Sequence, residues 1–209
     1  MNQRVAIIGF WSGVLAAIAT IAFDVVQTLQ LTGTLQFPAD EILIYSSSLC
    51  IVVPFIIEML AFHHLTERDR QFWTLGALLF TVVYAVFVSA NYVTQLATVI
   101  PAKLNGDYEA VRALDQTPHS MFWNFDAIAY ISMGFAFLLA IPALNKQGFE
   151  RWVRYAFLAH VLVTPLIAVV YFYPHYSNSL LLLGFPWGIT APLSMALLAV
   201  ALSKVAARE

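Results

Sequence analysis

The chain has 209 residues, of which 61% are hydrophobic and 11% are charged, whereas a soluble domain carries about 25% charged residues. This composition excludes an ordinary soluble domain and is typical of an integral membrane protein. The net charge of −2 argues against a nucleic-acid partner, because binding to nucleic acid requires clustered lysine and arginine.

Apolar segments follow one another along the whole chain. A membrane span needs roughly 20 apolar residues, and six spans fit at about residues 5–31, 42–65, 71–100, 120–144, 151–173 and 179–203. Little sequence remains for another domain. The sequence therefore predicts an all-α integral membrane protein, a single six-transmembrane-helix bundle whose main partner is the lipid bilayer.

Basic residues gather at the termini and in the even-numbered loops. The basic residues at the termini and in the even-numbered loops are Arg4, Arg68, Arg70, Lys146, Arg151, Arg154, Lys204 and Arg208. Only Lys103 and Arg112 lie in the odd-numbered loops. The positive-inside rule then predicts that both termini are cytoplasmic, and we expect the cytoplasmic (inner) membrane of a bacterium. We interpret the first apolar run as a retained helix, because it is too long for a signal peptide.

The first span carries polar residues near its outer end. Asp24, Gln27 and Thr28 share one helical face with Thr20. At 1.5 Å per residue, Asp24 is expected about 12 Å below the outer surface.

Two ionisable residues are expected elsewhere in the membrane. Glu58, in the second span, is placed roughly 10 Å from the cytoplasmic end, and His160, in the fifth, is placed near mid-depth. We consider both as candidates for a proton relay.

The third span has a polar face within residues 84–100. Tyr84, Asn91, Gln95 and Thr98 recur at helical spacing. Polar side chains at membrane depth normally turn towards one another or towards a cavity, so we expect this face to point into the bundle.

The 101–119 loop is the longest connection. Leu104, Tyr108, Val111 and Leu114 have the spacing of one helical face, which predicts a short amphipathic helix on the outer surface. We expect residues 106–115 to form that helix and to cover the mouth of a cavity. A solvated loop is the alternative.

The fourth span begins with a stripe of His119, Trp123, Asp126 and Tyr130. Asp126 is expected about 10 Å below the outer surface, a depth similar to that of Asp24. We therefore predict that Asp24, Asn91, Gln95 and Asp126 share one outer-half cavity, with the remaining candidate ligand-binding residues at Gln27, Trp123 and Tyr130.

No lysine or arginine lies well inside a span. Each buried carboxylate should therefore be protonated, hydrated or paired with a cation. The alternative is a purely structural role, in which Asp126 hydrogen-bonds to Asn91 or Gln95 across helices.

The sequence favours no metal and no cofactor. The five histidines offer neither a zinc ligand set nor a facing haem pair, and the HExxH, GxSxG, GxxxxGK and CxxC motifs are absent. The only cysteine, Cys50, leaves no intrachain disulfide.

Faint matches between residues 5–100 and 120–203, such as VVPFI at 52–56 and VTPLI at 163–167, suggest an inverted repeat or chance similarity. Three hypotheses for function follow. The first, which we favour, is a protein that binds or transports a small solute, cation or proton in the outer-half cavity. The second is an intramembrane enzyme acting on a lipid or isoprenoid-type substrate by carboxylate and histidine chemistry. The third is an accessory or structural subunit. Ligand identity and oligomeric state stay open.

Overall fold

The computed structural model describes residues 2–207, and within that range the chain forms helices and loops without a strand. The six long helices of this range are α1 (Asn2–Leu31), α2 (Ala39–Leu65), α3 (Gln71–Thr94), α6 (Met121–Ala140), α7 (Glu150–Phe172) and α9 (Phe185–Ala206). With their short extensions, all six are long and apolar enough to cross a membrane. The all-α bundle predicted from the sequence is confirmed.

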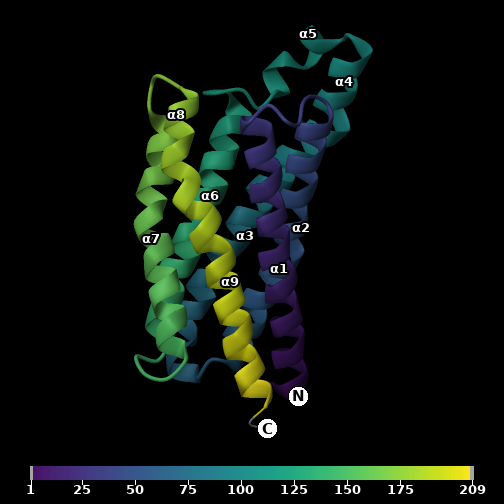
Figure 1. Cartoon of the computed structure of the whole chain (residues 1–209). Coiled ribbons are helices and arrows are strands. Elements are labelled where there is room, and N and C mark those ends of the chain that lie inside the picture. Colours follow the sequence, from purple (N-terminus) through teal and green to yellow (C-terminus); the bar gives the residue numbers. More distant parts are fainter. Residues whose placement is uncertain (1, 208–209) are drawn as a thin grey trace.

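Short helical elements extend or connect the long ones. They are η1 (Arg68–Arg70), η2 (Gln95–Val99), α4 (Ile100–Asn105), α5 (Tyr108–Val111), η3 (Arg112–Leu114), η4 (Ile141–Ala143), α8 (Asn178–Leu181) and η5 (Leu182–Gly184). Figure 1 shows α5 and α8 at the end of the bundle opposite both chain ends. We call this the outer end, following the predicted orientation.

The long helices form a closed ring in chain order. Each packs against its predecessor and its successor, and α9 returns to pack along α1. Figure 1 shows α1 and α9 at the front of the bundle, converging towards the end that holds both termini, with successive helices running in opposite directions. The ring places α1 opposite α6, α2 opposite α7 and α3 opposite α9, around a shared interior.

The ring order argues against an inverted repeat. A two-fold axis in the membrane plane reverses the direction of each helix and also the sense in which the helices follow one another around the bundle. Here α6, α7 and α9 continue around the ring in the same sense as α1, α2 and α3. The matches between the two halves of the sequence therefore do not correspond to an inverted structural repeat.

The outer surface of the bundle is apolar, whereas its interior is lined by small and polar residues. In α1, Ile8, Trp11, Leu15 and Ile18 are more than half exposed, whereas Gly9, Gly13, Ala16 and Thr20 are buried. Water would penalise such a large exposed apolar surface, but hydrocarbon would not. Small inward residues let neighbouring helices approach closely, so this distribution fits an integral membrane protein.

The 106–115 segment is helical but broken. We expected one amphipathic helix, and the structure has the single turn α5 followed by the 3₁₀ turn η3. Val111 is buried and Leu114 is half-buried, but Leu104, assigned to the same apolar face, is 58% exposed. The cause is Gly106, whose positive φ of 83° ends α4 and redirects the chain before the predicted face can continue.

The polar face of α3 ends earlier than predicted. Tyr84, Asn91 and Gln95 are buried, but Thr98 is exposed and Val99 is buried in its place. Residues Gln95–Val99 form a π-helical turn, in which the amide of Ile100 donates to the carbonyl of Gln95. This wider turn holds an additional residue, so the inward face moves from Thr98 to Val99.

Candidate functional site

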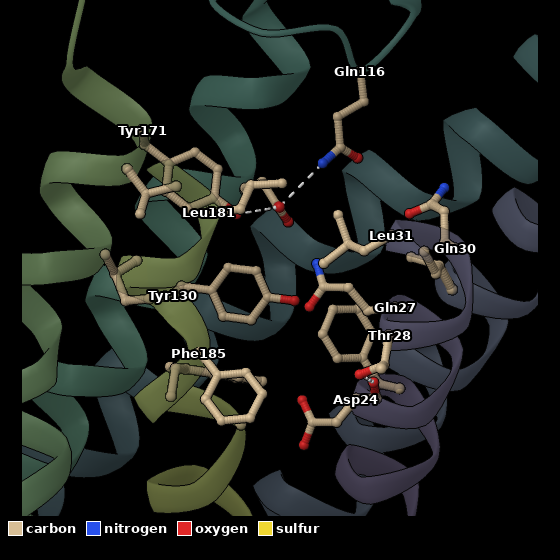
Figure 2. A pocket seen from close by; sticks show the side chains of 18 of the residues that line it. Asp24, Gln27, Thr28, Gln30, Leu31, Gln116, Tyr130, Tyr171, Leu181 and Phe185 are labelled. Atoms are coloured by element: carbon tan, nitrogen blue, oxygen red, sulfur yellow. Dashed lines mark hydrogen bonds between the residues drawn. The ribbon is translucent and has the colours of Figure 1, made fainter. Parts of the chain in front are cut away.

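A pocket of about 370 Å³ opens near the outer end of the ring. Five of the seven candidate ligand-binding residues line it, namely Asp24, Gln27, Trp123, Asp126 and Tyr130. Figure 2 shows the Asp24 carboxylate, the Gln27 amide and the Tyr130 hydroxyl turned towards the same space. Residues on α1 and α6, about 100 positions apart in the sequence, therefore meet in one cavity.

Asp126 forms one wall of the pocket and is held by donors from three parts of the chain. Its Oδ1 accepts from the hydroxyl of Tyr92 at 2.6 Å. Its Oδ2 accepts from the hydroxyl of Tyr171 at 2.6 Å and from Nε2 of Gln116 at 3.0 Å. Figure 2 shows the side chains of Gln116 and Tyr171 converging on this carboxylate. The side chain is 4% exposed, so these bonds replace the water that it would otherwise bind.

Asn91 and Gln95 lie behind this wall and do not line the pocket. Asn91 donates to Oε1 of Gln116 at 2.9 Å. Gln95 donates to the carbonyl of Leu114 at 2.8 Å and accepts from the amide of Gln116 at 3.3 Å. Our expectation that both amides face the cavity together with Asp24 and Asp126 differs from the structure, because Asn91 is bonded to the side chain of Gln116 and Gln95 is bonded to the backbone of Leu114 and Gln116. Their role is to hold Gln116 in place over Asp126.

Asp24 faces the pocket from α1 and has no such support. It is half-buried, and within residues 2–207 no protein group donates to its carboxylate. A Cβ at position 188 would lie 2.7 Å from Oδ1 of Asp24, so Gly188 is what allows α9 to pass this close. Among the described residues that line the pocket there is no lysine, arginine or histidine.

Aromatic side chains make up much of the remaining wall. The rings of Trp123 and Tyr171 lie 4.8 Å apart, and Nε1 of Trp123 donates to the carbonyl of Tyr171 at 3.1 Å. The rings of Tyr130 and Trp187 also lie 4.8 Å apart, edge to face. The rings of Phe23 and Trp187 lie 5.9 Å apart, also edge to face. These contacts fix the rings and give the pocket a rigid lining.

The outer rim is closed by ion pairs. Nζ of Lys103 lies 3.1 Å from Glu41 and 3.0 Å from Asp115, and the hydroxyl of Tyr108 donates to Asp115 at 3.1 Å. Glu41 lines the pocket, but its charge is already balanced by Lys103. Asp24 and Asp126 are therefore the acids of the pocket that have no basic partner among the described residues.

Glu58 and His160, the candidates for a proton relay, lie apart from the pocket lining. Glu58 is fully buried between α1 and α9, where a Cβ on Gly13 would overlap it. His160 packs near Trp187, and its Nδ1 lies 3.1 Å from the hydroxyl of Thr190. Trp187 and Ala199, the α9 neighbours of the two groups, are separated by about 18 Å at 1.5 Å per residue. The structure does not bring the two side chains together.

Within residues 2–207, no histidine lines the pocket beside Asp24 and Asp126. His119 is exposed, and His63 hydrogen-bonds to Thr74. In the part of the chain that the structure describes, no group of three histidine, cysteine or acidic side chains is arranged to hold a metal ion.

Sequence reasoning missed four residues that shape the site, which are Tyr92, Gln116, Tyr171 and Trp187. Tyr92 directly follows Asn91 and lies about 100° from it around a helix, so it was not among the residues of the predicted polar face. Tyr171 belongs to the cluster YFYPHY, which resembles an aromatic belt at a membrane surface. Gln116 carried no signal, because it is not among the residues whose spacing predicted a helix in the 101–119 loop.

Comparison of the chain with protein-family models, curated proteins and solved structures gives no match. Inference about function therefore depends on the geometry of the pocket.

Proposed function

We propose that this chain is a membrane protein that binds or transports a small solute in the outer-half pocket, with both termini in the cytoplasm of a bacterium. One observation carries the proposal. A cavity of about 370 Å³ contains the Asp24 carboxylate without a donor from residues 2–207. Ligand sites typically have volumes of roughly 300 to 1,000 Å³, with apolar walls and a few polar groups, and this pocket has both features.

Binding or transport is favoured over acid–base catalysis by the surroundings of the carboxylates. A general acid and a general base must both reach one bound group. Within residues 2–207 no histidine hydrogen-bonds to Asp24, Glu58 or Asp126. An enzyme acting on a lipid would have to use one of these carboxylates without a histidine partner.

The proposal is tested by a thermal-unfolding screen of the purified protein against a library of small solutes grouped by charge. A solute at about 100 times its Kd stabilises the folded state by roughly 2.7 kcal/mol. For a chain of this size that corresponds to a rise in Tm of about 5 to 11 °C. We expect such a rise for at least one class of solute.

The matched variant is Gln27→Trp, which fills part of the pocket from α1 and should abolish the rise. If the wild type and Gln27→Trp respond identically to every class, the pocket is not a solute site. An accessory or structural subunit then explains the chain better.

A further inference from the structure

The charged residues around the pocket favour a ligand of positive charge over one of negative charge. Asp24 and Asp126 both line it, and the rim cation Lys103 is already paired with Glu41 and Asp115. Asp126 has three protein donors, whereas Asp24 has none among residues 2–207. An incoming cation would therefore find an unpartnered carboxylate at Asp24, while an anion would meet two acids and no base.

The pocket wall distinguishes an organic cation from a metal ion. Aromatic faces attract ammonium groups, and this attraction grows when water is excluded. Phe23, Phe185 and Trp187 line the pocket with Asp24, and Figure 2 shows the ring of Phe185 and the Asp24 carboxylate turned towards the same space. A metal ion such as Ca²⁺ requires six to eight oxygen ligands, and the described residues supply no such cluster.

The open side of the pocket is apolar. Leu31 on α1 is 50% exposed, and Leu182 in η5 and Phe185 at the start of α9 are each 65% exposed, although all three line the cavity. Along α1, Leu31 lies about 11 Å further out than Asp24, counting seven residues at 1.5 Å each. An apolar group on a bound molecule would lie along them, next to the outer leaflet.

We propose that the pocket takes a small amphipathic organic cation, an amine or ammonium whose charged group sits at Asp24 and whose apolar body lies between α1 and α9. This inference rests on the proposed function and names the class of its ligand. A volume of about 370 Å³ is small for a ligand site, so a single aromatic ring with a short aminoalkyl chain is the size that fits.

The test uses three probes that share one body and differ in charge. They are 2-phenylethylammonium, 2-phenylethanol and phenylacetate, titrated by calorimetry into the protein in lipid nanodiscs at neutral pH, with NaCl and CaCl₂ as inorganic controls. We expect the ammonium to bind at least tenfold more tightly than the alcohol or the carboxylate. Asp24→Asn should weaken its binding at least tenfold, and Glu58→Gln, which alters a buried carboxyl outside the pocket, should leave it unchanged.

A second variant keeps the test decisive if Asp24→Asn does not fold. Gln27→Lys places an ammonium of the protein's own in the pocket, one helical turn from Asp24, and should compete with the probe. We expect it to fold and to lose at least tenfold in affinity for 2-phenylethylammonium. Unchanged binding by Gln27→Lys would overturn the proposal.

The remaining outcomes separate this inference from the proposed function. If the alcohol or the carboxylate binds as tightly as the ammonium and Gln27→Trp removes that binding, the pocket is a solute site but the cationic class is wrong. If only Na⁺ or Ca²⁺ binds in a manner that depends on Asp24, the site belongs to an inorganic ion. If no probe binds and the solute screen also fails to distinguish Gln27→Trp from the wild type, both proposals fall.

Discussion

Tyr171 provides the sharpest test of the Asp126 network. The change Tyr171→Phe removes one hydroxyl and keeps the ring that packs against Trp123. A hydrogen bond to a charged group contributes roughly 1.5 to 3 kcal/mol. For a chain of 150 to 250 residues, each kcal/mol shifts Tm by about 2 to 4 °C. We therefore expect Tm to fall by about 3 to 12 °C, measured by intrinsic fluorescence during heating in detergent.

The control is Tyr173→Phe, two residues further along the chain. Tyr173 is 50% exposed, so loss of its hydroxyl should leave Tm nearly unchanged. A double-mutant cycle combining Tyr171→Phe with Asp126→Asn isolates the interaction between the two side chains. If both tyrosine variants lower Tm equally, or if the cycle gives no coupling energy, the hydroxyl of Tyr171 does not support Asp126.

Two further predictions concern packing and orientation. Gly188→Val should lower Tm by several degrees and close part of the pocket, because a Cβ at this position lies 2.7 Å from Asp24. The control is Gly184→Ala, which should be tolerated because the side chain nearest to a Cβ there is 3.6 Å away. A normal Tm for Gly188→Val, measured in the same heating assay, would show that α1 and α9 do not approach closely. For orientation, a cysteine at Asp107 in a Cys50→Ser background should react with an impermeant maleimide from outside intact cells, and a cysteine at Lys146 only after lysis. The reverse pattern would place the termini outside.

The fold was predictable because a membrane-spanning helix must be apolar and about 20 residues long, and both properties can be read from the sequence. Each expected span agrees with a long helix to within about five residues. The exceptions are local. The π-helical turn at Gln95–Val99 and the positive φ of Gly106 change helical register, and neither follows from apolar periodicity. The ring order was equally hidden, since hydropathy does not say which helices are neighbours.

The site was partly predictable for a related reason. A polar residue within an apolar span is costly unless it turns inward, and this argument found Asp24, Gln27, Asp126 and Tyr130. It could not separate groups that face a cavity from groups that hold a loop, which is why Asn91 and Gln95 were assigned to the pocket. It was also blind to Gln116, because a glutamine in a loop is ordinary in water and its reach into the bundle depends on tertiary structure.

The ring order has a consequence for how the protein assembles during synthesis. Each long helix can pack on the one made before it, so most of the bundle forms as the chain emerges. Only the seam between α1 and α9 must wait for the last helix. Until then Gly9 and Gly13 of α1, which also lie against Ala61 and Glu58 of α2, lack their α9 neighbours Leu202 and Ala199. A chain truncated before Phe185 would therefore leave this face of α1 uncovered. Such a face is available for incorrect pairing with other helices and for recognition by quality-control proteases.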